Sequence, residues 1–131
     1  MKKTNLSKIF FLVAVCVIIG SVTVSAALIG TSSATLSDTQ TSSTGNLVAL
    51  WGTSGTGRLR VISYNGESVT AKAMKVRVAW FDQTLETVQT NSNIWTAWTP
   101  PFPLSTVDVG YYVRVEGDKS AKGKGEFEVY Q

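Results

Sequence analysis

The most informative absences in this chain are those of histidine and cysteine. The 131 residues include no histidine and a single cysteine, Cys16. Zinc sites built on imidazole or thiolate, histidine-based triads and cysteine nucleophiles are therefore excluded beyond residue 16. Carboxylates remain, but Glu126 and Glu128 share one face of a strand-like segment, whereas the two acids of a glycosidase face each other across a cleft. We expect no enzymatic activity, no metal and no cofactor.

The N-terminus has the composition of an export signal. Three lysines within the first eight residues precede an uncharged apolar run, and Val24-Ser25-Ala26 then offers small residues for cleavage. This order predicts a signal peptide over residues 1–26. The alternative is a retained membrane-anchor helix, because residues 9–29 carry no charge and number about the 20 that a bilayer needs. We expect a secreted protein, or one on the extracellular face of the membrane and held there through residues 9–29 if they stay uncleaved.

A surplus of positive charge is also missing once this signal is set aside. The formal charge of +3 comes from 12 basic and 9 acidic residues, and three of the basic ones lie before residue 9. The rest of the chain therefore carries nine charges of each sign. Because phosphate binding needs a surplus of basic side chains, we expect no nucleic-acid partner.

Large apolar side chains are scarce in residues 27–45. Ten of the fourteen residues from Thr31 to Thr44 are serine or threonine, and Leu36 is their one sizeable apolar side chain. Such a segment buries too little surface to offset the entropy of ordering, which predicts a flexible stalk or linker. Two alternatives stay open. The stalk could carry O-linked glycans, or residues 27–44 could add as a strand to the sheet edge of a neighbouring copy and build a filament.

The remainder of the chain alternates apolar and polar side chains as β-strands do, without the 3.6-residue spacing of an amphipathic helix. Arg58 to Tyr64 is one such strand. Asn65-Gly66 follows it and favours a type I′ turn, which predicts a hairpin into residues 67–71. Residues 74–81 predict another strand, with Trp80 as the central aromatic residue of the core.

Three further segments complete the predicted sheets. Residues 47–51 are apolar on both faces, which favours a strand that is covered from two sides or that lies across the end of a sandwich. Residues 85–88 are a candidate edge strand. Residues 109–130 alternate on either side of a glycine-rich connection, which predicts a C-terminal hairpin lying on the core. About seven short strands in residues 46–131 fit a single all-β domain, a small two-sheet sandwich.

A short motif at the start of that C-terminal segment suggests a family. Asp108-Val109-Gly110-Tyr111-Tyr112 resembles the Asp-x-Gly-x-Tyr entry into the penultimate strand of immunoglobulin-like domains. The resemblance implies an immunoglobulin-like β-sandwich, in which the tyrosine hydroxyl ties back to the backbone. The apolar phase favours Tyr111 as the inward residue, and Arg114 stands where antibody domains carry cysteine. A superfamily fold implies an architecture and no particular activity.

An aromatic cluster is the first candidate binding surface. Trp95, Trp98 and Phe102 flank a proline-rich segment, residues 100–103. Prolines lack the N–H that a central strand donates, so this segment is not a central strand of a ladder. The cluster is either a packed corner or an exposed platform on which sugar rings stack.

The second candidate is a local concentration of positive charge. Lys119, Lys122 and Lys124 lie in the glycine-rich connection of the C-terminal segment, which we predict to be a mobile hairpin tip. Surface lysines of this kind serve solubility in most proteins. The alternative is a basic surface loop that binds an acidic polysaccharide or a phospholipid surface.

Together these features predict a non-enzymatic module of prokaryotic origin, secreted or anchored at the cell surface, with a structural or adhesion role. One version of this role is self-assembly by strand addition. The alternatives are a carbohydrate-binding module that uses exposed tryptophans and a small secreted toxin or antimicrobial protein. The expected partner is a cell-surface protein, a polysaccharide or another copy of the chain.

Overall fold

The computed structural model describes residues 26–51, 54–104 and 109–131, and the predicted signal or anchor over residues 1–26 lies almost wholly outside them. In these ranges the chain forms nine β-strands, and no helix in them is long and apolar enough to cross a membrane. The strands are β1 (Leu28–Leu36), β2 (Ser42–Thr44), β3 (Val48–Leu50), β4 (Gly55–Ser63), β5 (Val69–Lys75), β6 (Gln83–Thr90), β7 (Phe102–Leu104), β8 (Val109–Gly117) and β9 (Gly123–Tyr130).

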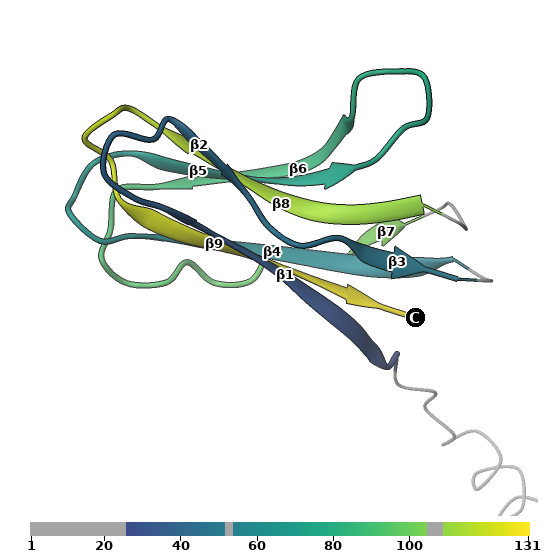
Figure 1. The fold of residues 1–131 in the computed structure, drawn as a ribbon. Helices are drawn as coiled ribbons and strands as arrows, with labels where there is room; N and C mark the ends of the chain where they lie inside the picture. Colours follow the sequence, from purple (N-terminus) through teal and green to yellow (C-terminus); the bar gives the residue numbers. More distant parts are fainter. Residues whose placement is uncertain (1–25, 52–53, 105–108) are drawn as a thin grey trace, which may run out of the picture.

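The strands form two antiparallel sheets packed face to face (Figure 1). The β9 sheet has the order β1-β9-β4-β7, and the β8 sheet has the order β2-β8-β5-β6, with β3 also paired to β8. The all-β, two-sheet prediction is confirmed for the described residues. Alternate side chains of each strand point between the sheets because successive residues face opposite ways. Phe127 and Tyr111 are the largest fully buried side chains and meet edge to face, with ring centroids 6.4 Å apart.

The two predicted hairpins are both wrong. β8 and β9 lie in different sheets, so the segment 109–130 crosses the core instead of folding back on itself. β4 and β5 also lie in different sheets, and Asn65 has no positive φ angle, so Asn65-Gly66 is not a type I′ turn. The Asn65 amide donates instead to the carbonyl of Ser120 at 2.7 Å and its Oδ1 accepts from the N–H of Lys122 at 3.2 Å. Asn65 therefore connects the loop between β4 and β5 to the loop between β8 and β9.

The predicted stalk is also wrong, because residues 28–36 and 42–44 form strands β1 and β2 of the sandwich. The inward residues of β1 are Ser32, Ala34 and Leu36, all of them buried. β9 places glycines opposite this strand, Gly125 against Ala34 and Gly123 against Leu36. Because these glycines have no side chain, the residues of the other sheet approach β9 closely beside β1, while the outward threonines suit an extended backbone. Backbone pairing and this close fit replace the bulky side chains that the segment lacks.

Residues 74–81 do not continue as a strand, so the prediction of Trp80 as a core residue is wrong. β5 ends at Lys75, and residues 76–82 form a loop that projects from the β8 sheet (Figure 1). Trp80 is 74% exposed. Ala79 has a φ of 65°, in the left-handed region that an extended strand cannot contain. The alternation of side chains in the sequence therefore continues for several residues beyond the end of strand β5.

Of the predictions for residues 85–88 and 47–51, the first is confirmed and the second holds only in part. Residues 85–88 lie in β6, which pairs only with β5, so the predicted edge strand is confirmed. The segment 47–51 contributes the three-residue strand β3, whose Val48 and Leu50 are buried. Leu47 and Trp51, at its two ends, are more than 60% exposed, so the segment is covered only in its middle.

Candidate functional site

The outer face of the β9 sheet carries a row of paired charges. Arg58 lies opposite Glu128 and Arg60 opposite Glu126 in the register of β4 and β9. Arg58 Nε is 2.6 Å from Glu128 Oε2, and Arg60 Nη2 is 2.5 Å from Glu126 Oε2. Lys124 Nζ approaches Glu126 Oε1 at 3.3 Å. The two glutamate side chains are only 16% exposed, so these pairs are shielded from solvent more than ordinary surface ion pairs.

Aromatic rings interleave with the arginines and complete what we call the arginine–aromatic ladder, made of Trp95, Arg60, Trp98, Arg58 and Tyr130. The Arg60 guanidinium carbon is 4.3 Å from the ring centroids of both Trp95 and Trp98. Arg58 is 4.7 Å from the Trp98 centroid and 5.1 Å from that of Tyr130. At these distances each arginine makes cation–π contacts on two sides. The hydrogen bond to Glu128 is the main cause that raises the pKa of Arg58.

Two threonines hold the tryptophans in place. The segment that contains them runs along the exposed edge of β4 without forming a strand. Thr96 exchanges two bonds with Val61: its N–H donates to the Val61 carbonyl, and its hydroxyl accepts from the Val61 N–H. Thr99 does the same with Leu59. The three-residue spacing of the threonines therefore sets the spacing of Trp95 and Trp98.

The three aromatic residues predicted to bind a ligand do not form one platform. Trp95 and Trp98 lie together on the outer face and are half-buried, joined through Arg60. Phe102, in β7, turns toward the core and stacks on Phe127, with ring centroids 5.7 Å apart and planes at 24°. A sugar ring would have to stack on tryptophan faces against which arginines already lie. Carbohydrate binding by these residues stays a prediction.

A shallow cavity of about 240 Å³ adjoins the end of the ladder. That volume is smaller than the roughly 300–1,000 Å³ of most small-molecule sites. Its walls combine the polar ends of the ladder with small and apolar residues from the strand ends. They are Ala26, Thr56, Gly57, Arg58, Pro101 and Tyr130.

The basic loop does not form the predicted mobile hairpin tip. Its Ala121 is fully buried, and the N–H of Thr39 donates to the carbonyl of Lys119 at 3.2 Å. Lys122 Nζ lies 2.8 Å from Asp38 Oδ1, and Lys124 belongs to β9, where it pairs with a glutamate. Two of the three lysines are thus already matched by carboxylates, which leaves little positive charge for an acidic ligand.

Sequence reasoning missed the loop of residues 76–82, whose stem is fixed and whose tip is apolar. The N–H of Val76 donates to the Gly110 carbonyl at 2.9 Å. The two carboxylate oxygens of Asp82 accept from the N–H of Arg77 at 3.3 Å and from the Tyr112 hydroxyl at 2.5 Å. The composition Val-Ala-Trp-Phe looks like a buried strand, so the sequence signal pointed to the core. An aspartate directly after the aromatic pair was the one sign of a turn.

Burial, and then the hydrogen bond to Asp82, raises the pKa of Tyr112 above its ordinary value of 10.0. The unfolded chain therefore loses this proton first as the pH rises, so the tyrosine contributes stability below about pH 10 and loses it above. We expect the free energy of unfolding in urea to fall as pH rises past about 10, and to fall less in Tyr112→Phe. Tyr64→Phe, a change at an exposed tyrosine, is the control and should follow the wild type. Equal slopes for all three proteins would contradict the assignment.

No family model, no curated protein and no solved structure matches this chain. Its function must therefore be inferred from its own geometry.

Proposed function

We propose that the protein is an exported, non-enzymatic structural or adhesion module of the cell surface, and that copies join by exchanging strand β1. The observation that carries this proposal is the position of β1. It is the first strand after the predicted signal. It lies at the edge of the β9 sheet, where its only partner strand within the described residues is β9, over eight registered residue pairs. A terminal edge strand can leave its sheet and re-pair with a neighbouring copy without disturbing the order of the other strands.

The connection after β1 has the features of a hinge. Residues 37–41 are all exposed, so they can extend without uncovering the core. Thr39 has a φ of 69°, a left-handed conformation that is strained for a β-branched residue. Extending the connection would relieve this strain, at the cost of the Asp38 to Lys122 ion pair and of the backbone hydrogen bonds that Thr39 and Thr41 make with Lys119 and Gly117. Strained hinges of this length favour strand exchange between copies.

Exchange would also preserve the contacts that β1 makes. Ser32, Ala34 and Leu36 fill an inward row, and the hydroxyl of Ser32 accepts a hydrogen bond from the Val113 N–H at 3.0 Å. A copy that gives its β1 away is left with an open groove along β9, which the β1 of the next copy can fill with the same residues. Reciprocal exchange between two copies would close a dimer, whereas exchange passed from each copy to the next continues as a filament, and the second arrangement is the one that we propose.

A cysteine pair tests the exchange. Thr35 and Lys124 lie directly opposite each other in the β1 and β9 register and point outward. Neighbours of this kind lie within the Cα separation that a disulfide spans. In a Cys16→Ser background, we expect Thr35→Cys/Lys124→Cys, oxidised after concentration, to give a ladder of covalent multimers on a non-reducing gel. Oxidation of the dilute monomer should instead lock β1 in its own sheet and prevent later assembly.

Single-cysteine variants control for random cross-linking, because Thr35→Cys alone gives dimers at most. The proposal is contradicted if the concentrated double variant forms intrachain disulfides alone, and if electron microscopy of the wild type at the same concentration shows only monomers. Normal filaments from the locked protein would also contradict it, since they would have to form without exchange of β1.

We further propose that the sandwich is a jelly roll. What supports this is the strand order, in which most connections pass from one sheet to the other as in the double Greek key of that fold, while β2 and β3, and β5 and β6, stay within the β8 sheet. An immunoglobulin domain instead keeps its last two strands in one sheet, and the described residues form nine strands where about seven were expected. Membership of the immunoglobulin superfamily, implied by the motif at residues 108–112, stays a prediction. The fold as such implies no activity.

A further inference from the structure

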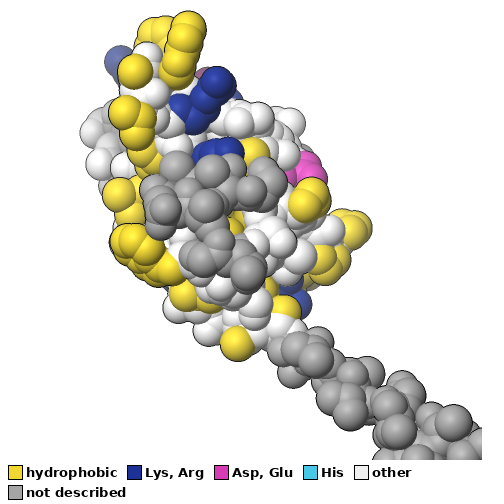
Figure 2. All heavy atoms as spheres, turned by 90° about the vertical axis from the view of Figure 1, so that its right-hand side faces the viewer, with side chains coloured by type: hydrophobic (Ala, Val, Ile, Leu, Met, Phe, Trp, Pro, Cys, Tyr) yellow, Lys and Arg dark blue, Asp and Glu magenta, His cyan; other side chains and the backbone are white. Residues whose placement is uncertain are grey.

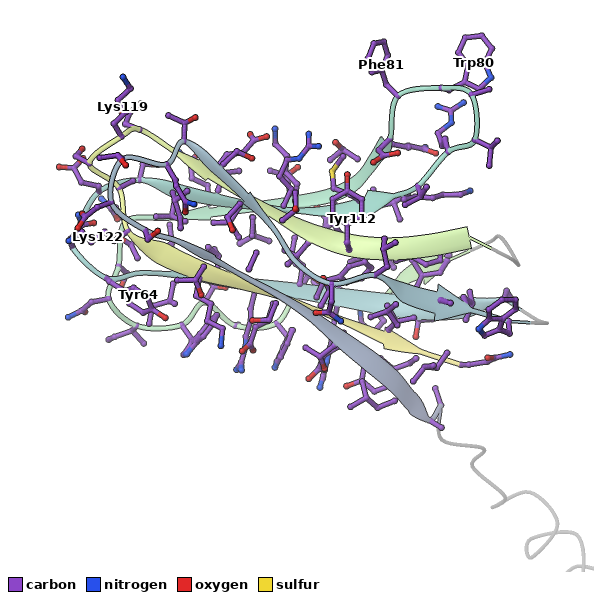
Figure 3. The ribbon with its side chains drawn as sticks, in the orientation of Figure 1. Tyr64, Trp80, Phe81, Tyr112, Lys119 and Lys122 are labelled. Atoms are coloured by element: carbon purple, nitrogen blue, oxygen red, sulfur yellow. The ribbon has the colours of Figure 1, made fainter. Side chains whose placement is uncertain are left out.

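The loop of residues 76–82, which we call the apolar loop, exposes three large hydrophobic side chains. Val78 is 87% exposed, Trp80 74% and Phe81 97%. Figure 3 shows both aromatic side chains directed away from the sandwich. Large apolar side chains gathered on one projecting loop mark a contact site, because isolated exposed residues are common whereas clusters are not. The stem held by Asp82 keeps the tip from collapsing onto the sheets.

The loop lies at the end of the sandwich at which β1 begins (Figure 1). Hydrogen bonds connect this end: Ala27 and Gln131 exchange two backbone bonds of 2.8 and 2.9 Å, and Gln131 Nε2 donates to the Trp51 carbonyl at 2.6 Å. Trp51 is 66% exposed and Leu28 is 52% exposed. Figure 2 looks onto this end and shows hydrophobic side chains on it, including those of the projecting loop at the top.

The chain itself indicates what covers this end. Residues 9–29 form an uncharged and largely apolar stretch, the last two residues of which begin β1. A stretch of this kind enters the bilayer during export, and it stays there if it is not cleaved. The end of the sandwich at which β1 begins is therefore close to the membrane surface during export. The position of the loop is consistent with that surface, since tryptophan favours the interface between headgroups and acyl chains.

The charges of the loop fit the same partner. Arg77 is exposed beside the apolar tip, and a cation there suits a phospholipid headgroup layer. The Asp82 carboxylate, the nearest acidic group in the sequence, has both oxygens engaged in the stem. We propose that this end of the domain binds a phospholipid bilayer, with Val78, Trp80 and Phe81 inserted in the interfacial layer. The strand exchange proposed above does not depend on this contact, because none of these residues belongs to β1.

The position of the lysines makes the proposal sharply testable. Lys119 and Lys122 lie with Tyr64 at the end of the sandwich opposite Trp80 and Phe81 (Figure 3). Binding through the lysines would require anionic lipid and would weaken with salt, whereas insertion of the apolar loop would proceed on zwitterionic vesicles and would be nearly insensitive to salt.

The test uses the full chain, in whichever processed form its host releases it, with phosphatidylcholine vesicles that carry brominated acyl chains. Bromine quenches tryptophan fluorescence only at short range. We expect the vesicles to quench the wild-type emission, the Trp80→Phe variant to lose a clear part of that quenching, and Trp95→Phe to retain it. For a cleaved, soluble form we also expect Trp80→Ser/Phe81→Ser to lower vesicle partitioning about tenfold or more.

Tyr64→Ser/Ile94→Ser is the matched control, because it removes two exposed hydrophobic side chains outside the loop, 52% and 72% exposed. Its partitioning should equal that of the wild type. Quenching that is unchanged in Trp80→Phe would overturn the proposal. So would binding that requires anionic vesicles and is lost in Lys119→Gln, or a Trp80→Ser/Phe81→Ser variant that loses self-association while the wild type ignores vesicles. The last result would assign the loop to a second copy of the chain.

Discussion

Phe127→Ala is expected to lower the free energy of unfolding by about 3–5 kcal/mol, the usual cost of removing a buried phenylalanine ring. Phe127 is fully buried at the centre of β9. Its ring is stacked on Phe102 and meets the edge of Tyr111, so the cavity left behind would be lined by two aromatic rings from different sheets. For a domain of this size, with no disulfide, that loss is a large part of the total stability. Urea unfolding followed by circular dichroism measures it.

Phe81→Ala is the matched control for this change. The same atoms are removed from a side chain that is 97% exposed, so the unfolding free energy should move by no more than about 0.5 kcal/mol. Equal effects of the two substitutions would mean that the loop of residues 76–82 packs onto the domain in solution. That result would contradict both the core assignment and the exposed loop.

Ser32→Ala is expected to cost about 1–3 kcal/mol, although it removes a single oxygen atom. Ser32 is fully buried, and its hydroxyl accepts the N–H of Val113 at 3.0 Å. At this point β8 has no strand partner on one side, because β2 ends at Thr44 and β3 begins at Val48. The serine thus completes the hydrogen bonding of the opposite sheet. Alanine would leave a buried N–H without an acceptor.

Ser33→Ala provides the comparison within the same strand. Ser33 points to the outer face and is half-buried, so its loss should change the unfolding free energy by less than about 0.5 kcal/mol. Chemical denaturation of the two variants side by side separates the buried hydrogen bond from the strand propensity of serine. A Ser32→Ala variant as stable as Ser33→Ala would show that β1 does not occupy this position in solution.

The candidate surfaces were only partly readable from the residues. The alternation of Arg58 and Arg60, and of Glu126 and Glu128, showed that each pair shares a face, but not that the two strands are neighbours. Charge complementarity between residues 66 and 70 positions apart becomes an interaction only once the register is known. The loop of residues 76–82 was missed for a related reason, since an apolar segment that contacts a partner has the composition of a buried one.

By itself, the sequence determined the secondary-structure class and the faces of most strands, since alternation of side chains is a local property of the extended backbone. It also determined the edge position of residues 85–88. The tertiary structure alone decided which strands pair, so it placed β8 and β9 in different sheets and used Asn65 as a tie between loops. It also ordered the serine- and threonine-rich segment, because the glycines of β9 let the other sheet approach closely there. Pairing depends on contacts between distant segments, and no local pattern contains them.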